Sequence, residues 1–137
     1  MVTLILLFPL AGVLINLLFG FRRGEKFAGR VATGAMALAF LAGAGAWLSL
    51  LALPPGQRAL RSALFEWIPA GLGQVGDLTA NFSVDFAMRI DALSSTMLLI
   101  VTWIGFLIHV YATGYMSHEK GYTRFFTYLN LFMFMML

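Results

Sequence analysis

The stretch ALSSTMLLIVTWIGFLIHVYA, residues Ala92 to Ala112, decides the fold class of this chain. It holds 21 residues without a formal charge. At about 1.5 Å of rise per residue, such a helix is about 30 Å long, which matches the hydrocarbon core of a bilayer. The stretch therefore predicts a membrane-spanning helix, and His109 is its single titratable side chain.

The composition of the whole chain agrees with a lipid environment. Hydrophobic residues make up 61% of the 137 residues and charged residues 11%, against about 45–50% and about 25% in soluble domains. The absence of cysteine excludes disulfides and thiolate metal sites. No cluster of basic and aromatic residues points to nucleic acid, and no cofactor or metal motif is present. We therefore expect this chain to bind no nucleic acid, cofactor or metal.

Three further apolar stretches lie outside this segment. Residues 2–21 and 31–53 are long enough to span a bilayer, and residues 125–137 predict the start of a fourth span, at about 20 Å of helix. The first stretch carries no charge and exceeds the usual length of a signal-peptide core, so we interpret it as a retained span. The segments 22–30 and 113–124 are expected to be loops.

Residues 54–91 contain no span and predict a small β-hairpin outside the bilayer. In NFSVDFAMRID (Asn81–Asp91) apolar and polar residues alternate with period 2, which is typical of a half-buried strand. ALFEWIP (Ala63–Pro69) is the expected partner strand, and glycines 71, 73 and 76 suit the turn. The predicted fold class is an all-α integral membrane protein with three complete transmembrane helices, the start of a fourth, and this hairpin between helices two and three.

Lysine and arginine counts in the loops predict the orientation. The segments 22–30 and 113–124 carry six basic residues together, and the segment 54–91 carries three. Because basic loops stay on the cytoplasmic side, we expect 22–30 and 113–124 to be cytoplasmic, with the hairpin and the N-terminus outside the cell membrane.

Polar residues of the third predicted helix fall on one narrow face. At about 100° per residue, the residues that share this face are Asp91, Ser95, Thr102, Gly105, His109 and Thr113. The face lines a hydrated proton route with His109 as relay, or it packs against another helix through small and hydroxyl side chains. Asp91 precedes the helix and is expected to cap its N-terminus.

Two asparagines are the strongest hydrogen-bonding groups of the other spans. Asn16 lies in the first predicted helix and Asn130 in the fourth. Amide side chains at membrane depth usually bond across helices, so both are expected to hold helices together rather than to bind a substrate.

The third and fourth spans also resemble a known family. RIDALSSTMLLIVTWIGFLIHVYATGYM (Arg89–Met116) and YTRFFTYLNLFMFMML (Tyr122–Leu137) are similar to chain L of bacterial NADH–quinone oxidoreductase, respiratory complex I. FEWIPAG (Phe65–Gly71) resembles the outer hairpin of that family. The likeness is strongest over residues 82–137 and covers the N-terminal part of a much longer family protein.

The resemblance implies a role in redox-coupled proton translocation. Family members are antiporter-like, many-helix subunits in the membrane arm of complex I, in the bacterial inner (plasma) membrane. Their partners are lipid and the other membrane-arm subunits. In the family, the key glutamate and lysines would lie beyond Leu137, so this chain is expected to hold no catalytic centre of its own and no soluble substrate. The FLIH motif makes His109 a candidate for proton routing.

Two alternatives stay open at this point. The chain could be the N-terminal part of an Mrp-type sodium/proton antiporter subunit, which resembles chain L but has no redox partners. It could also be a non-catalytic membrane fragment that retains these helices for packing.

Overall fold

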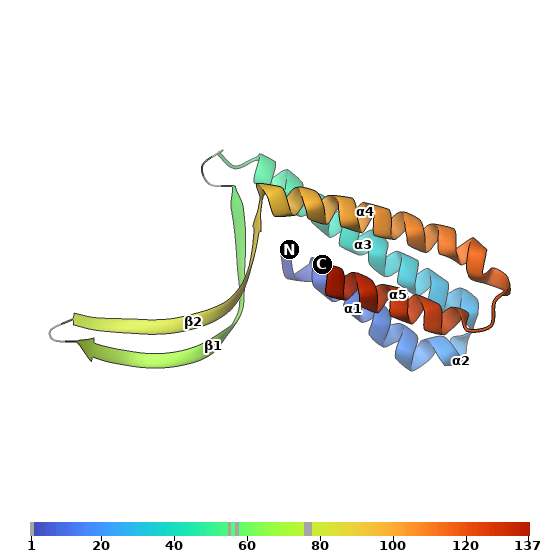
Figure 1. The fold of residues 1–137 in the computed structure, drawn as a ribbon, viewed down its shortest axis with the longest axis horizontal. Helices are drawn as coiled ribbons and strands as arrows, with labels where there is room; N and C mark the ends of the chain where they lie inside the picture. Colours follow the sequence, from blue (N-terminus) through green and yellow to red (C-terminus); the bar gives the residue numbers. More distant parts are fainter. Residues whose placement is uncertain (1, 55, 57, 76–77) are drawn as a thin grey trace.

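The computed structural model describes residues 2–54, 56, 58–75 and 78–137, apart from the side chains of residues 69–83. Four helical rods lie side by side, and a long hairpin projects from one end of the bundle (Figure 1). The first rod comprises α1 (Val2–Ile15), the π-helical turn η1 (Asn16–Gly20) and α2 (Phe21–Arg23). The other rods are α3 (Glu25–Leu51), α4 (Ala92–Tyr115) with the 3₁₀ turn η3 (Met116–His118), and α5 (Tyr122–Met136).

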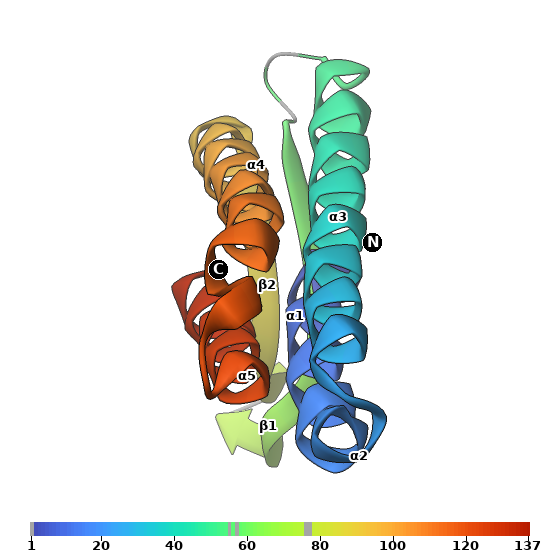
Figure 2. The same cartoon turned by 90° about the vertical axis from the view of Figure 1, so that its right-hand side faces the viewer.

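The rods run up and down in turn, so the described chain begins and ends near the hairpin (Figures 1 and 2). Helix α3 contacts α1, α4 and α5, and α5 also packs on α1. Within the described part of the chain, three helical stretches are long and apolar enough to cross a bilayer, namely Val2–Arg23, Glu25–Leu51 and Ala92–His118. These helices and the hairpin between the second and third rods confirm the predicted fold class.

The connection between the first two rods differs from the predicted loop 22–30. Helix α3 begins at Glu25, and Gly24 alone separates it from α2. Gly24 has φ +93°, a backbone conformation that glycine adopts without a steric penalty. The segment from Glu25 is helical because an acidic residue in the first turn suits the helix dipole, and because Ala28 and Ala32 are fully buried against the neighbouring rods.

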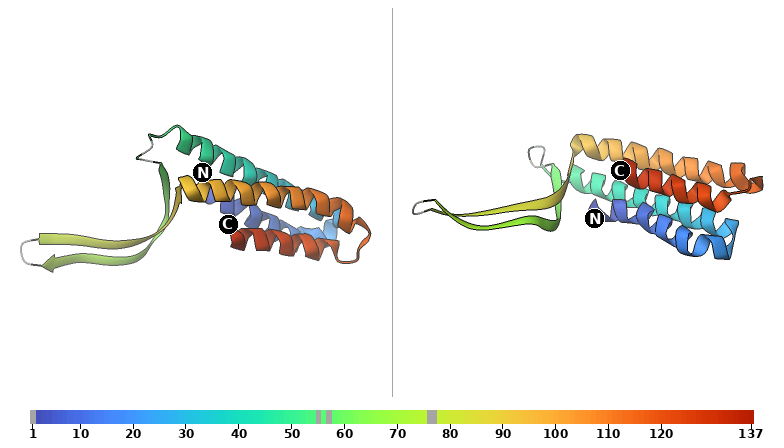
Figure 3. Two further views of the ribbon diagram at one scale, coloured as in Figure 1. Left: turned by 45° about the horizontal axis from the view of Figure 1, so that its top comes forward. Right: turned by 60° about the horizontal axis from the view of Figure 1, so that its bottom comes forward.

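The hairpin is longer than the sequence pattern indicated. Strand β1 (Ala59–Val75) pairs antiparallel with β2 (Leu78–Asp91), from Ala59 opposite Asp91 to Val75 opposite Leu78. The glycines 71 and 73 therefore lie within β1 rather than in the turn, where continued pairing satisfies the backbone groups; Gly76 lies outside the described residues. Three register shifts interrupt the pairing. Such shifts bend a strand pair, and the hairpin curves away from the helices (Figure 3).

Many large apolar side chains cover the outside of the bundle, and small and polar side chains make up much of its interior. Leu41, Leu48 and Ile104 are about half exposed or more, whereas Ala39 and Thr102 are fully buried. A side chain at Gly43 would come within 2.8 Å of Leu98 in α4, so the glycine permits close approach of α3 and α4. This distribution suits a bundle whose surroundings are hydrocarbon.

Candidate functional site

Among the residues whose side chains the structure describes, seven polar ones are buried between the four rods. Apolar clusters lie toward both ends of the bundle: one joins Val2, Ile5 and Leu50 near the hairpin, and the other joins Ala32 and Phe126 near the opposite end. The buried polar residues are Asn16, Ser95, Thr102, His109, Thr123, Thr127 and Asn130. Polar groups away from water need partners within the protein, and their partners define the candidate site.

Helix α4 turns its predicted polar face inward. Its buried residues are Ser95, Thr102, Gly105, His109 and Ala112. The two residues at the ends of this predicted face are less buried than those between them, because Asp91 is exposed and Thr113 is half-buried.

His109 is held at both ring nitrogens. Its Nδ1 lies 2.7 Å from the carbonyl oxygen of Gly105, one turn earlier in α4. Its Nε2 lies 3.0 Å from Oδ1 of Asn130 in α5. The ring is fully buried and faces the ring of Phe126, with 6.1 Å between the centroids. The structure thus joins two residues that the sequence had placed on different helices.

The hydrogen-bond partners restrict where the imidazole carries its protons. A backbone carbonyl can only accept, so Nδ1 donates to Gly105. If the ring is neutral and Nδ1 carries the proton, Nε2 is unprotonated and can only accept a hydrogen bond. The Asn130 amide can donate this bond from Nδ2 after a rotation of 180° that exchanges its oxygen and nitrogen. A doubly protonated ring instead donates from Nε2 to Oδ1, as the atoms are placed. Nδ2 of Asn130 has no partner among the described residues, so rotation of one amide serves both protonation states.

The hydroxyl groups on the polar face of α4 do not continue the hydrogen bond between His109 and Asn130 into a longer network. Ser95 donates to Ala92 at 2.9 Å, and Thr102 donates to Leu98 at 2.8 Å, each within its own helix. Thr113 donates to Val110 at 2.7 Å in the same way. None of these hydroxyls bonds His109 within the part of the chain that the structure describes. The buried part of this face therefore packs against the neighbouring helices and carries His109 as its titratable residue.

The second asparagine, Asn16, closes the turn between the first two rods. Its Nδ2 donates to the carbonyl of Ala28 at 3.1 Å, while Oδ1 has no partner among the described residues. Asn16 begins η1, a π-helical turn, and such turns often occur at functional positions in helices.

Gly12 is a residue of the site that the sequence argument missed. A Cβ at this position would overlap Asn130 Nδ2 and come within 2.9 Å of Ala35 Cβ. The bare backbone of α1 therefore leaves the space in which the Asn130 amide sits. A signal was present in the sequence, because Gly12 precedes Asn16 by one helical turn and small residues mark close helix contacts.

Asp91 lies apart from this cluster, at the junction of β2 and α4. Its Oδ1 accepts from the Ser94 backbone N–H at 2.8 Å, and the Ser94 hydroxyl accepts from the Asp91 N–H at 2.9 Å. This reciprocal capping box begins α4. The Ser94 backbone N–H, followed by the Ser94 hydroxyl, lowers the pKa of the Asp91 carboxyl.

Comparison with known proteins gives the same family as the sequence motifs. Residues 78–126, from β2 into α5, match a family model described as "NADH-Ubiquinone oxidoreductase (complex I), chain 5 N-terminus". A protein of Pseudomonas aeruginosa named NADH-quinone oxidoreductase subunit L is 42% identical over 134 residues, covering 96% of this chain and 20% of the relative.

Further relatives carry the same name. The Mycobacterium tuberculosis protein is 39% identical over 98% of this chain, and the Escherichia coli protein is 36% identical over 96% of it. This chain spans about a fifth of the length of the curated relatives it matches. The resemblance to chain L is thus confirmed along nearly the whole chain, and the matched segment includes the capping box and His109.

Proposed function

We propose that this chain forms the N-terminal membrane part of an antiporter-like subunit L in a proton-pumping NADH–quinone oxidoreductase. The observation that carries the proposal is the 42% identity to a protein of that name over 96% of the chain. The three helices long enough to span a bilayer and their polar interior support it. The relatives named above are all subunits of this enzyme, which favours complex I over an Mrp-type antiporter.

Within that assembly, His109 and Asn130 form the group of this chain that handles a proton. The Asn130 amide can accept from or donate to Nε2, so this ring nitrogen keeps a hydrogen-bond partner whether the ring gains or loses a proton. Ser95, Thr102 and Thr113 support the face that carries His109. In this proposal the chain contributes helices and one titratable side chain to the proton route. The redox reaction that drives pumping takes place in other parts of the enzyme.

The proposed surroundings are lipid and the other subunits of the membrane arm. The half-exposed leucines and isoleucines of α1, α3 and α4 suit contact with acyl chains. Lysine and arginine counts favour a cytoplasmic location for the segments 22–30 and 113–124, and an outer location for the hairpin.

Purification of the assembly from the cells that encode it tests this function. A tag at the N-terminus of the subunit should bring down an assembly that oxidises NADH with a quinone as acceptor. The protein composition of the eluate would be determined by mass spectrometry. An eluate that lacks NADH-oxidising subunits, from membranes that exchange sodium for protons without NADH, would support the Mrp-type alternative instead.

A further inference from the structure

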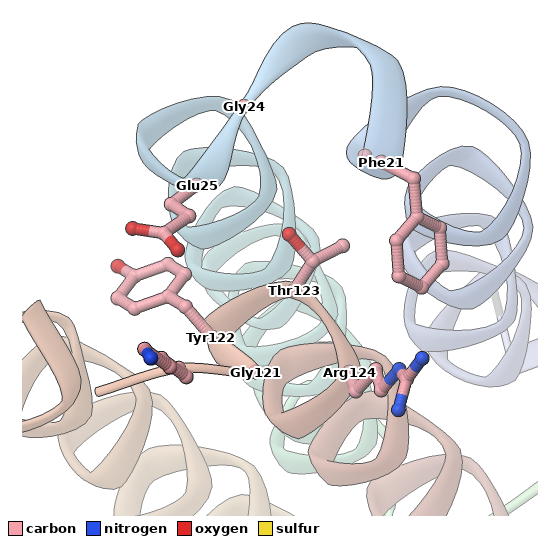
Figure 4. Close-up of a pocket in the computed structure, with 9 residues that line it drawn as sticks. Phe21, Gly24, Glu25, Gly121, Tyr122, Thr123 and Arg124 are labelled. Carbon is pink, nitrogen blue, oxygen red and sulfur yellow. The ribbon is translucent and has the colours of Figure 1, made fainter.

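The bundle end opposite the hairpin contains a pocket with charged residues in its lining, which the proposed function does not use. A cavity of about 440 Å³ opens there, and Figure 4 shows its walls. Its lining comes from the end of the first rod, the Gly24 turn and the start of α5; the lining residues with polar side chains are Glu25, Lys120, Tyr122, Thr123 and Arg124. The segments around it carry six basic residues and two acidic ones.

Two helix N-termini converge on this pocket without a side-chain cap. Helix α3 begins after Gly24 and α5 begins after Gly121, and neither glycine can supply a capping oxygen. The first backbone N–H groups of each helix lack intrahelical partners and carry the positive end of the helix dipole. Such ends bind phosphate and other anions readily. Glu25 offsets part of this positive charge, because its carboxylate lies beside Tyr122 at the start of α5 (Figure 4).

A mostly buried threonine, Thr123, lines the pocket. Thr123 is 7% exposed, and its hydroxyl forms no hydrogen bond with any residue that the structure describes. Its oxygen is directed toward the turn between α2 and α3 (Figure 4). Its methyl group packs against Gly20, where a Cβ would come within 2.8 Å. The hydroxyl therefore faces the cavity as an unused donor.

The basic side chains around the pocket also lack anionic partners within the described part of the chain. None of the six has a carboxylate oxygen of a described side chain within 4.0 Å. Arg23 lies over the rings of Phe19 and Phe27 at 5.7 and 5.2 Å, which leaves its charge unneutralised. Lys120 and Arg124 line the cavity itself. A ligand that meets these groups and the Thr123 hydroxyl must be negatively charged and rich in acceptor oxygens.

Exposed apolar side chains beside the pocket indicate that the anion is part of a lipid. Phe21 lines the cavity and is 56% exposed, and Leu17 and Leu18 continue an apolar surface along the same rod. On α5, Tyr128 and Phe132 are also mostly exposed. A phosphate attached to acyl chains can place its charge in the pocket and its chains along this surface. Basic pockets between membrane helices bind anionic headgroups in this way.

We propose that this pocket binds the phosphate group of an anionic phospholipid. The free N–H groups of α5, the Thr123 hydroxyl, Lys120 and Arg124 hold the phosphate, and Phe21 contacts the chains beside it. The site requires that the helices lie in a bilayer, and it does not depend on the enzyme to which the subunit belongs.

Retention of lipid by the full chain tests the proposal. The protein is reconstituted in nanodiscs of phosphatidylcholine with a minor fraction of phosphatidylglycerol, and bound lipid is counted by native mass spectrometry after release. We expect phosphatidylglycerol to stay bound preferentially. Thr123→Val keeps the shape and charge of the site, and it should lower this retention about tenfold or more, as loss of one hydrogen bond to a charged group predicts.

Two double variants that remove the same number of positive charges distinguish a specific lipid site from general electrostatic attraction. Lys120→Gln with Arg124→Gln should abolish the preference, whereas Arg58→Gln with Arg61→Gln near the hairpin should leave it unchanged. Equal losses in the two double variants, or full retention in Thr123→Val, would overturn the proposal. Inorganic phosphate added to discs of phosphatidylcholine alone is the second arm, read by ³¹P line broadening. Broadening by the protein without phosphatidylglycerol retention would mean a soluble anion and would refute the lipid.

Discussion

At the scale of single residues, the contact between His109 and Asn130 is the feature that the sequence could not supply. The inward position of His109 follows from the period of α4, because Ser95, Thr102 and Gly105 share its face. Its partner depends on the rotation and depth of α5 against α4, which no local pattern encodes. The same holds for Asn16, whose bond to Ala28 requires the single-residue turn at Gly24.

A double-mutant cycle should show that these two side chains are energetically coupled. His109→Leu and Asn130→Leu each remove one side of the 3.0 Å contact. We expect a coupling free energy of about 1 kcal/mol, typical of interhelical hydrogen bonds in membranes. Thermal unfolding of the four proteins in detergent measures it. Strictly additive losses of stability would mean that the two groups do not interact.

Gly12 should tolerate no side chain, although most helical glycines gain stability when replaced by alanine. Gly12→Ala places a Cβ against Asn130 and Ala35, and we expect a loss of about 1–3 kcal/mol from overpacking. Gly34 in α3 has nothing within 4 Å of the same position, so Gly34→Ala is the matched control, with an expected gain of up to about 1 kcal/mol. Equal effects at both glycines, in the same unfolding assay, would contradict the packing described here.

At the scale of elements, local chemistry predicted the start of α4 but not the length of the hairpin. Asp91 stands directly before an apolar helical run, and its carboxylate accepts the Ser94 N–H. The alternation of β2 indicated a strand near the helix, where Ile90 is buried. The outer part of the hairpin depends on pairing between strands, and its glycines suggested a turn that the structure places farther out.

The capping box should make α4 sensitive to acid. Because hydrogen bonds from Ser94 lower the pKa of Asp91 in the folded state, its stabilising effect is complete above the ordinary carboxyl pKa. It is lost as the pH falls through the lowered value. Asp91→Asn keeps an accepting oxygen and removes the titration, so the wild-type protein should lose stability relative to Asp91→Asn in that acidic range. Parallel pH profiles of unfolding for the two proteins would refute the role of the charge.

At the scale of the whole molecule, composition and span length were sufficient to predict a membrane bundle. The excess of apolar residues and the uncharged stretch 92–112 required lipid, and the structure places their large side chains outside. The order of the rods around the polar interior could not be predicted, since it depends on contacts such as those of Gly12 and Gly43. The side of the membrane on which each end lies is a proposal from charge alone.

Cysteine labelling tests that orientation, and residues 1–137 contain no cysteine that would compete with the introduced one. Single variants Lys26→Cys and Ser117→Cys should resist a membrane-impermeant reagent in intact cells, while Arg61→Cys in β1 should react. All three should react once the cells are opened, which controls for burial. Labelling at position 26 in intact cells would reverse the predicted orientation.

The central claim is that these helices work as the N-terminal part of a proton-pumping subunit L. The most direct measurement exchanges the matching segment of the Pseudomonas aeruginosa subunit for this chain and follows NADH-driven proton uptake in inverted vesicles, per assembled complex. A chimera with the Escherichia coli segment is the control for the exchange. We predict that this chain supports pumping as the control does, and that His109→Leu lowers pumping more than assembly. An assembled chimera that oxidises NADH without proton uptake, beside a pumping control, would contradict the account.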